Sequence, residues 1–477
     1  MFIGIDLGTS GVKALLIDDR QRVLGSAHAA LTVSRPHPGW SEQDPAEWVR
    51  AAGMALDELA AAHDLSGVSG LGLSGQMHGA VALDADDQVL RPAILWNDTR
   101  SHVEAEELDA DPQFRLISGN IVFPGFTAPK LVWMARNEAA LFDRIAKVLL
   151  PKDYLRLWLT GEHVAEMSDA AGTSWLDTGG RDWSDKLLAA SGMRRDQMPA
   201  LVEGNAPSGR LRPELATRWG MGSVVVAGGA GDNAATAVGA GTTEVGQGFV
   251  SLGTSGVVFA ATDRYLPLPE SAVHAFCHAL PGRWHQMGVI LAASDAVTWL
   301  SSVLGRSPSE LTSGLGRLQA PGRTMFLPYL SGERTPHNDA QARGLFAGLE
   351  PTTDREGLVR AVLEGVAFAL ADNLAALRQA GARPTALLAL GGGAQSDYWL
   401  RAIATAMDLP ILRPEGGDFG AAFGAARLGL MAATGARPDD ICTQPAIAAE
   451  IAPDPALRGA FSDAHARFRA LYPAARG

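Results

Sequence analysis

The amino-acid sequence predicts an α/β protein of two similar domains, because one motif occurs twice and strand-like runs alternate with helix-like runs. The six residues Leu-Gly-Thr-Ser-Gly-Val at positions 7–12 recur without change at positions 252–257. This separation far exceeds the roughly 20–50 residues of a solenoid repeat. The chain has 477 residues, a length that fits two domains of ordinary size. We therefore expect two copies of one fold, over residues 1–244 and 245–477.

Each copy of the motif lies between two short apolar runs, a pattern typical of a β-hairpin. The runs cover residues 2–5 and 14–17 around the first copy, and residues 249–252 and 257–260 around the second. In the first turn, the backbone amides and the hydroxyls of Thr9 and Ser10 can face an anion such as phosphate. Two ordinary hairpins would give the same pattern, but their identical turns favour phosphate binding.

Asp6 ends the first strand-like run, beside this turn. A carboxylate in this place suits Mg²⁺, which favours one or two protein carboxylates together with waters and substrate phosphate. All five lysines of the chain lie in the first 186 residues, and none follows a glycine. The Gly-Lys pair of a P-loop is therefore missing, and an ATP site would need a different fold.

Composition narrows the class of protein. Lys and Arg total 40 and Asp and Glu total 52, giving a net charge of −12, which argues against a nucleic-acid partner. The two cysteines, Cys277 and Cys442, form no disulfide framework and indicate a reducing compartment. Because neither a signal-peptide pattern nor an apolar run of about 18 residues occurs, we expect a cytoplasmic protein without a membrane span.

Asp232 follows a predicted strand at residues 224–227 and four small residues at 228–231. The helix-like run at 234–239 places Asp232 at the N-cap position, which aspartate favours. Capping alone would explain the residue. The small residues before it, however, allow a ligand to approach closely, so that one carboxylate could both cap the helix and act in catalysis.

Two further turns follow predicted buried strands, and ligands of α/β proteins gather at strand ends. The strand at 68–73 enters the turn 74–79, in which His78 is either a hydrogen-bond partner of a sugar or a structural histidine. The strand at 387–390 ends in three glycines, 391–393, on which a flat ligand could lie. These glycines do not fit the Gly-x-Gly-x-x-Gly pattern of a dinucleotide site.

The remaining elements are predicted from helix signals and periodicity. A helix should begin with Asp44 as N-cap and Pro45 at its first position. Residues 100–225 have the pattern of an α-rich insertion, residues 355–377 that of a long helix, and the tail that of an amphipathic helix. Lys130 and Lys152, within the insertion, are expected either to contact a ligand or to be solvated structural lysines.

The repeated turn resembles the phosphate-binding hairpins of the actin, Hsp70 and sugar kinase superfamily. That resemblance implies two ribonuclease-H-like domains of the actin/hexokinase/Hsp70 ATPase type, with ATP in a central cleft. The order of motifs from Ile3 to about Leu471, including the segments 125–133 and 344–364, is similar to that of the FGGY carbohydrate kinases. Gly357 departs from the second segment, because the family prefers a polar side chain there.

Four stretches, 34–43, 75–79, 91–98 and 330–337, resemble the family members that phosphorylate D-xylulose. The resemblance implies transfer of phosphate from Mg²⁺-ATP to D-xylulose, with Asp232 as the base and Asp6 acting through the metal. It implies sugar contacts from Met77, His78, Asp232 and Asn233, and puts Trp299 near adenine. The nucleotide contacts that it implies are Gly8, Thr9, Ser10, Lys13, Gly253, Thr254, Ser255, Gly392, Gly393 and Ala394.

Two alternatives stay open at this point. A kinase of the same family could act on another ketose or on a polyol, because one or two pocket residues set the substrate. An actin-like ATPase would instead hydrolyse ATP without a sugar acceptor, and it would not need the loop at residues 76–78. We also allow for a homodimer.

Overall fold

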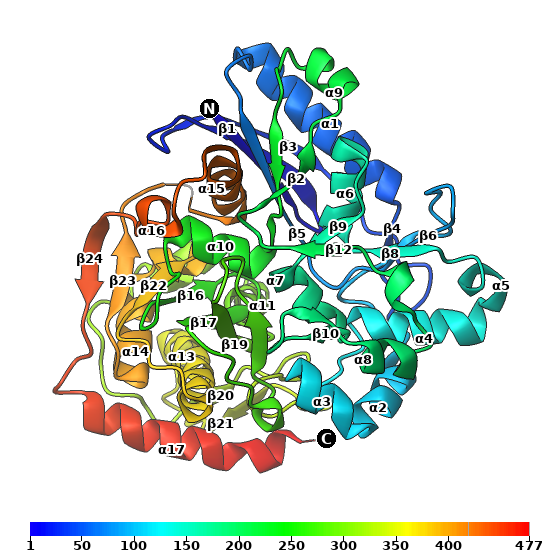
Figure 1. Ribbon diagram of the computed structural model, residues 1–477. Coiled ribbons are helices and arrows are strands. Elements are labelled where there is room, and N and C mark those ends of the chain that lie inside the picture. Colours follow the sequence, from blue (N-terminus) through cyan, green and yellow to red (C-terminus); the bar gives the residue numbers. More distant parts are fainter. Residues whose placement is uncertain (418, 477) are drawn as a thin grey trace. The chain divides into compact units, whose positions relative to one another are not determined.

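The chain folds into two compact α/β units in a computed structural model that describes residues 1–417 and 419–476 (Figure 1). Unit 1 contains Met1–Thr243, Phe276–Trp284 and a third stretch that ends at Gln444. Unit 2 contains Glu244–Ala275, His285–Gly417 and the chain from Pro445 onward. Each unit is built around one seven-stranded sheet, which confirms the predicted fold class. The linear division at residues 244 and 245 stays a prediction.

The sheet of unit 1 has the order β13-β14-β5-β1-β2-β3, with β15 also pairing with β5. β1 runs parallel to β5 and antiparallel to β2, so the first repeat forms the predicted hairpin. The strands of this sheet are β1 (Phe2–Leu7), β2 (Gly11–Ile17), β3 (Val23–Ala30), β5 (Gly70–Gly75), β13 (Pro207–Arg210), β14 (Val225–Ala227) and β15 (Ala230–Gly231).

Helix α1 (Pro45–Ala62) packs on the hairpin strands through an apolar face that includes Trp48 and Leu56. It begins as predicted, because the Asp44 side chain accepts a hydrogen bond from the amide of Ala46 at 2.9 Å. An N-cap of this kind satisfies an amide that has no partner inside the helix.

Helix α15 (Ala421–Thr434) also packs against β1 and β5, at backbone distance. A Cβ atom on Gly4 would lie 1.8 Å from the carbonyl oxygen of Ala422, and one on Gly72 would lie 1.9 Å from that of Ala425. Helix α10 (Asp232–Ala240) packs on α15 in the same way (Figure 1). The many small residues of α15 therefore serve close packing, as its sequence indicates.

The segment 100–225 is rich in helices, as predicted, with short strands between them. The other helices of unit 1 are α2 (His102–Ala110), α3 (Pro112–Ser118), α4 (Thr127–Asn137), α5 (Ala139–Phe142), α6 (Pro151–Thr160), α7 (Met167–Ala170), α8 (Asp185–Ala190), α9 (Pro213–Arg218) and α16 (Pro438–Ile441). Its short strands are β4 (Glu42–Gln43), β6 (Val81–Leu83), β7 (Ala93–Ile94), β8 (Lys147–Leu149), β9 (Val164–Glu166), β10 (Leu176–Asp177), β11 (Asp182–Trp183) and β12 (Ala200–Val202).

The sheet of unit 2 has the order β18-β19-β17-β16-β22-β23-β24. Its strands are β16 (Gly248–Leu252), β17 (Gly256–Thr262), β18 (His274–Cys277), β19 (Trp284–Ile290), β22 (Leu387–Leu390), β23 (Ile411–Pro414) and β24 (Ile447–Ile451). β16 and β17 pair antiparallel, so the second repeat is also a hairpin. A separate pair joins β20 (Met325–Leu327) and β21 (Leu345–Ala347).

The core of unit 2 centres on α13 (Arg355–Ala380), the predicted long helix. The predicted amphipathic tail is α17 (Arg458–Ala475), which adds Phe461 and Phe468 to this core. The other helices of the unit are α11 (Ser294–Leu304), α12 (Pro308–Thr312) and α14 (Asp397–Met407).

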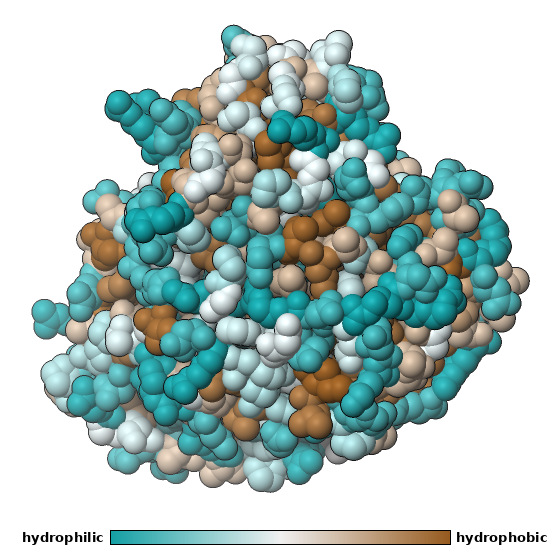
Figure 2. Space-filling model, viewed as in Figure 1, coloured by the Kyte–Doolittle hydropathy of each residue, from teal (hydrophilic) through white to brown (hydrophobic). Residues whose placement is uncertain are grey.

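Hydrophilic side chains predominate on the face seen in Figure 2, where hydrophobic ones form small scattered groups. Such scattered apolar residues are normal on a protein surface. Among the described residues, no helix combines the length and the apolar character that crossing a membrane requires.

Candidate active site

The predicted catalytic and sugar-binding residues of unit 1 lie at or just after the ends of three parallel strands, β1, β5 and β15. In the pairing register, Asp6 of β1 and Ala230 of β15 both lie opposite Ser74 of β5. Three segments therefore leave the sheet at the same edge: the first predicted phosphate turn (residues 8–10), the loop that contains Met77 and His78, and the chain at Asp232. The carboxyl ends of parallel strands are where α/β proteins bind ligands.

Asp232 is the first residue of α10 and not its N-cap, so the N-cap prediction is wrong. The cap is Gly231, since β15 keeps the backbone extended up to that residue. One carboxylate oxygen of Asp232, Oδ1, accepts hydrogen bonds from the amide of Asn233 at 2.7 Å and from its Nδ2 at 2.9 Å. Asn233 thus orients the carboxylate.

The environment of Asp232 makes its carboxylate more basic than usual. Burial raises the pKa of Asp232 to about 6, and the negative charge of Asp6 adds to this rise, while the hydrogen bonds from Asn233 oppose it. A general base works best when its pKa is close to the operating pH. At pH 7.5 the Asp232 carboxylate is ionised and still attracts a proton more strongly than an ordinary aspartate does.

Asp6 lies opposite Lys13 in the β1–β2 pair. Side chains of directly opposed residues in antiparallel strands project from the same face of the sheet. Within the described chain, no group of three or more His, Cys, Asp or Glu side chains could enclose a metal ion. Asp6 lies close enough to Asp232 for the two carboxylates to interact electrostatically. Such a site suits Mg²⁺, which takes only one or two carboxylate ligands from a protein and fills its other positions with phosphate and water.

His78 is held from several sides. Its Nδ1–H donates to the carbonyl of Gly172 at 2.7 Å, which makes Nε2 the acceptor nitrogen of the neutral ring. The ring stacks on Phe126, with centroids 4.4 Å apart. The backbone of His78 has φ of +70°, and its carbonyl accepts from Lys130 Nζ at 2.7 Å and from Thr127 Oγ1 at 3.2 Å. These contacts fix both the ring and the loop.

Met77 is buried against the turn that leads to Asp232. A Cβ atom on Gly231 would lie 2.9 Å from Met77 Sδ. Met77 and His78 therefore combine an apolar surface with a hydrogen-bond acceptor at the strand end that carries Asp232. A sugar, with its carbon and hydroxyl faces, can use both.

The first phosphate turn is tied to the loop after β5. The hydroxyl of Thr9 donates to Gln76 Oε1 and accepts from Trp96 Nε1, both at 2.9 Å. This hydroxyl already has protein partners, whereas Ser10 is exposed. No role for Trp96 was predicted from the sequence, and the fold brings its half-exposed ring to this turn.

In unit 2, the second phosphate turn and the glycines after β22 lie at one end of the sheet. β16 runs parallel to β22, with Ser251 opposite Leu390, so residues 253–255 and 391–394 both follow the same edge. Gly391 has φ of +86°, and a Cβ atom there would lie 2.9 Å from the carbonyl oxygen of Leu252. Only glycine suits this position.

A cavity of about 800 Å³ adjoins these glycines, and this volume suits a nucleotide. It is lined by residues from α11, from α12 and the segment after it, and from α14 and the segment before it, namely Ser294, Val297, Thr298, Pro308, Ser309, Thr312, Ser313, Gly316, Gly392, Gly393, Gln395, Ser396, Asp397, Tyr398 and Trp399. The side chain of Ala394 is instead buried in the core. Trp299 stacks on Phe326 and stands outside the lining set.

Lys130 and Lys152 are both fully buried, so the expectation of solvated lysines is wrong. Lys130 donates to the carbonyls of His78 and Gly125, at 2.7 and 2.8 Å. Burial lowers the pKa of Lys130 well below its usual range. Lys152 belongs to a cluster of buried charges. The His78 carbonyl that accepts from Lys130 lies 52 positions away in the sequence, and Lys152 contacts Glu166 and Asp169 of other elements as well as its neighbour Asp153. A local pattern around either lysine does not reveal the contacts with other elements.

Comparison with known proteins defines the family. Residues 1–239 match the N-terminal domain, and residues 248–433 the C-terminal domain, of the FGGY family of carbohydrate kinases. The chain belongs to this family, which confirms the resemblance seen in its motifs.

Several proteins that this chain resembles are named xylulose kinases. The chain is 52% identical to the xylulose kinase of Escherichia coli K12 over 436 residues, covering 91% of this chain and 90% of the relative. A crystal structure of a "xyloylose kinase" from Brucella ovis has a TM-score of 0.98, 65% identity and 99% coverage of both chains. The xylulose kinase structure from Rhodospirillum rubrum has a TM-score of 0.91 and 30% identity, covering 99% and 98% of the two chains.

Proposed function

We propose that this protein phosphorylates D-xylulose with ATP, giving D-xylulose 5-phosphate and ADP. The observation that carries the proposal is the meeting of Asp6, Met77, His78 and Asp232 at one edge of the sheet of unit 1. The xylulose kinase of Escherichia coli, 52% identical, supports the choice of sugar.

Asp232 is the base in this proposal. Its carboxylate accepts the proton of the sugar hydroxyl at C5 while the hydroxyl oxygen bonds to the γ-phosphorus. The bond from that phosphorus to the bridging oxygen breaks, and ADP leaves. Phosphoryl transfer depends on in-line positioning and on neutralising charge more than on covalent help from the protein. The pKa of about 6 suits Asp232 to receive the proton at physiological pH.

His78 and Met77 orient the sugar. Because Nδ1 of His78 donates to Gly172, its Nε2 accepts a hydrogen bond from a sugar hydroxyl. Met77 contacts the carbon face of the sugar, and Asn233 holds the Asp232 carboxylate in position. The reacting hydroxyl is thereby directed at the base.

Asp6 would hold Mg²⁺, and a bound Mg²⁺ offsets the negative charge that develops on the transferred phosphate. Lys13, opposite Asp6 in the hairpin, adds a positive charge toward the phosphates. The proposed phosphate contacts are Gly8, Thr9 and Ser10 of unit 1 and Gly253, Thr254 and Ser255 of unit 2. Gly392 and Gly393 border the nucleoside in the 800 Å³ cavity.

The proposed enzyme works in the cytoplasm, where its two buried cysteines, neither of them in a disulfide, would stay reduced. A homodimer is the assembly we propose to test by light scattering. A monomeric mass at micromolar concentration would reject it.

The test of function is sugar-dependent release of ADP, measured with D-xylulose, other ketoses and polyols in parallel. We expect D-xylulose to give the highest kcat/KM. A higher value for another ketose or polyol would assign a different member of the family. ADP release that no sugar accelerates would instead favour an ATPase.

A further inference from the structure

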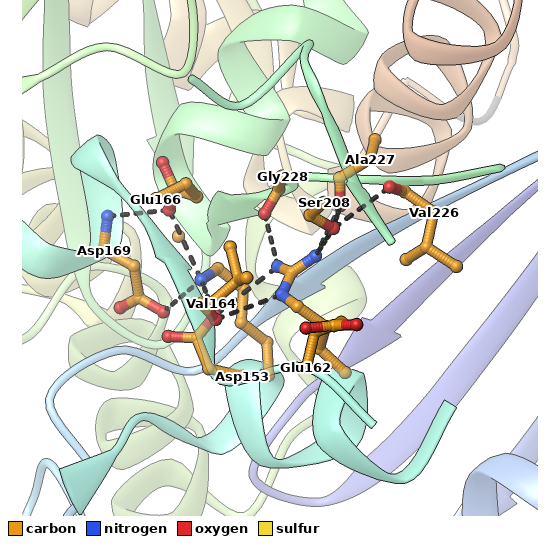
Figure 3. A network of polar contacts seen from close by, with 12 residues as sticks. Asp153, Glu162, Val164, Glu166, Asp169, Ser208, Val226, Ala227 and Gly228 are labelled. Atoms are coloured by element: carbon orange, nitrogen blue, oxygen red, sulfur yellow. Dashed lines mark hydrogen bonds and ion pairs between the residues drawn. The ribbon is translucent and has the colours of Figure 1, made fainter. Parts of the chain in front are cut away.

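A cluster of five buried charged side chains lies next to Ala227 and Gly228 (Figure 3), where the chain enters the turn that leads to Asp232. We call it the Lys152 cluster. Its members, all fully buried, are Lys152, Asp153, Arg156, Glu166 and Asp169. Lys152 Nζ lies 2.7 Å from Asp153 Oδ1, 3.0 Å from Asp169 Oδ2 and 3.4 Å from Glu166 Oε1. The cluster is thus an ion network inside unit 1.

A buried ion network is weak evidence for stability, because removing charges from water is costly and apolar residues of similar volume often do as well. Three carboxylates face two cations here. Burial raises the pKa of Asp169 well above its usual range, so that a proton on this group would balance the charges. Burial also acts against the charge of Lys152, but the three carboxylates outweigh it and raise the pKa of Lys152. Positioning is a role that such a network can serve.

One arm of the cluster grips the start of the turn before Asp232. Arg156 donates to the carbonyls of Ala227 and Gly228, and also to the hydroxyl of Ser208. Ser208 in turn donates to the carbonyl of Ala227 at 2.9 Å. The guanidinium therefore fixes the backbone where the chain leaves β14 (Figure 3).

A second arm reaches the end of the same turn through Ser168. Glu166 accepts from the amide of Ser168 at 2.6 Å, from its hydroxyl at 3.0 Å and from the amide of Asp169 at 2.9 Å. Because the Ser168 hydroxyl gives its proton to Glu166, its oxygen accepts from the amide of Gly231, at 3.1 Å. Gly231 is bonded directly to Asp232.

The segment after Glu166 also holds the sugar-binding loop. Gly172, in the 3₁₀ turn Ala171–Thr173, accepts the Nδ1–H of His78. A Cβ atom on Gly172 would lie 3.0 Å from Met77 Cε. One short segment therefore contacts the base turn and the sugar loop together.

We propose that the Lys152 cluster, acting through Glu166 and Ser168, positions Asp232 for proton transfer, an inference that rests on the proposed function. Ser168 is a positioning residue and touches no substrate. Its hydrogen bond holds the Gly231 peptide, so its loss should let the Asp232 carboxylate move from its productive place. A displacement of about 1 Å can lower a rate by roughly 100-fold.

The sharpest variant is Ser168→Ala, which removes one hydroxyl and leaves every charge of the cluster in place. Ser118→Ala is its matched control. The buried Ser118 hydroxyl likewise accepts from one amide, that of Asn120 at 3.3 Å, and donates to the carbonyl oxygen of Phe114 at 2.7 Å, with the Asn120 carbonyl oxygen farther away at 3.4 Å. The two variants thus lose similar hydrogen bonds in the same unit, and only one of these bonds leads to Asp232.

We expect Ser168→Ala to lower kcat with D-xylulose by roughly 10- to 100-fold and to leave the KM for ATP within twofold of the parent. The acidic limb of its pH–kcat profile should move to lower pH, because a carboxylate that gains water loses part of its raised pKa. Ser118→Ala should keep both the parent kcat and the parent profile. A folded Ser168→Ala with the parent kcat and profile would overturn the inference.

Hydrogen exchange of the segment 227–236 provides a measurement that needs no substrate. This segment should exchange faster in Ser168→Ala than in Ser118→Ala, and equal exchange would contradict the positioning role even if the parent lacked xylulose kinase activity. If Ser168→Ala does not fold, Glu166→Gln is the second variant, because it keeps an acceptor for Ser168 and weakens the link to Lys152. A lowered kcat in that variant supports the inference, and an unchanged kcat rejects it.

Discussion

Replacing Asp232 with asparagine should make the protein more stable at neutral pH. The substitution keeps the Oδ1 acceptor for Asn233 and removes a negative charge that is partly shielded from water and lies near Asp6. A carboxyl group whose pKa is raised by folding destabilises the native state wherever it is ionised. Sites built for catalysis commonly carry such a cost in stability.

The gain in the free energy of unfolding follows from the shift in the pKa of Asp232. Folding raises the pKa of Asp232 from 3.8 to about 6, and each unit corresponds to about 1.4 kcal/mol. The full shift would give about 3 kcal/mol. Because Asp232 is only partly buried, solvent screening reduces this figure, and we expect a gain of about 1–3 kcal/mol in the free energy of unfolding.

Because folding raises the pKa of Asp232, the stability difference between the two proteins depends on pH. Below pH 3.8 the carboxyl is protonated in both states and the two proteins should not differ through this group. As the pH rises from 3.8 through about 6, the parent loses stability that the asparagine variant keeps. The assay is thermal unfolding of both proteins at pH 7.5 and pH 4.5, without nucleotide or metal.

The control is Asp64→Asn. The Asp64 carboxylate accepts from the Ser66 amide, which holds its pKa below the usual value, so this substitution should not stabilise the fold. An Asp232→Asn protein that is less stable than the parent at pH 7.5, or equally stabilised at both pH values, would show that folding does not raise the pKa of Asp232.

Three further predictions concern the ligands. His78→Ala should lose about 1–3 kcal/mol of sugar binding, seen as a higher KM for D-xylulose in steady-state kinetics, and an unchanged KM would place His78 outside the pocket. Gly392→Leu should raise the KM for ATP, since a side chain there meets no protein atom within 4 Å and enters the cavity, whereas Gly459→Leu, equally unobstructed, should not. Asp6→Asn should increase the Mg²⁺ concentration needed for half-maximal rate. Because it removes a negative charge near Asp232, it should also shift the acidic limb of the pH–rate profile to lower pH. A parent-like Mg²⁺ dependence would argue against Asp6 as the ligand.

The sequence predicted the two hairpins well, because their determinants are local. Apolar runs of strand length flank a turn of small residues in both copies, and β1–β2 and β16–β17 form where expected. The start of α1 was also predictable, since Asp44 and Pro45 carry the capping signal in adjacent residues.

The position of Asp232 shows where local signals fail. A helix after an aspartate suggested an N-cap, but β15 pairs with β5 up to Gly231, and Gly231 becomes the cap. That pairing joins segments far apart in the chain. The same pairing places Ala230, two residues before Asp232, level with Asp6. Burial, together with the charge of Asp6, gives Asp232 the raised pKa that its proposed role needs.

The supporting residues could not be found from the sequence. Trp96 reaches Thr9, and Ser168 reaches Gly231, only through the tertiary fold. Lys130 and Lys152 have short-range neighbours typical of helix starts, yet both are fully buried: Lys130 contacts the His78 carbonyl, and Lys152 contacts Asp169 of α7 in addition to its neighbour Asp153. Burial of a charge depends on those partners, and no pattern around a lysine records them.

The most direct test of Asp232 as the catalytic base is the kcat of Asp232→Asn for D-xylulose, with both substrates saturating and folding checked by thermal melting. We expect a folded protein whose kcat is lower by roughly 10²–10⁴, the usual contribution of a general base, with ATP still bound at near the parent affinity. A folded Asp232→Asn protein that phosphorylates D-xylulose at near the parent rate would show that the base lies elsewhere.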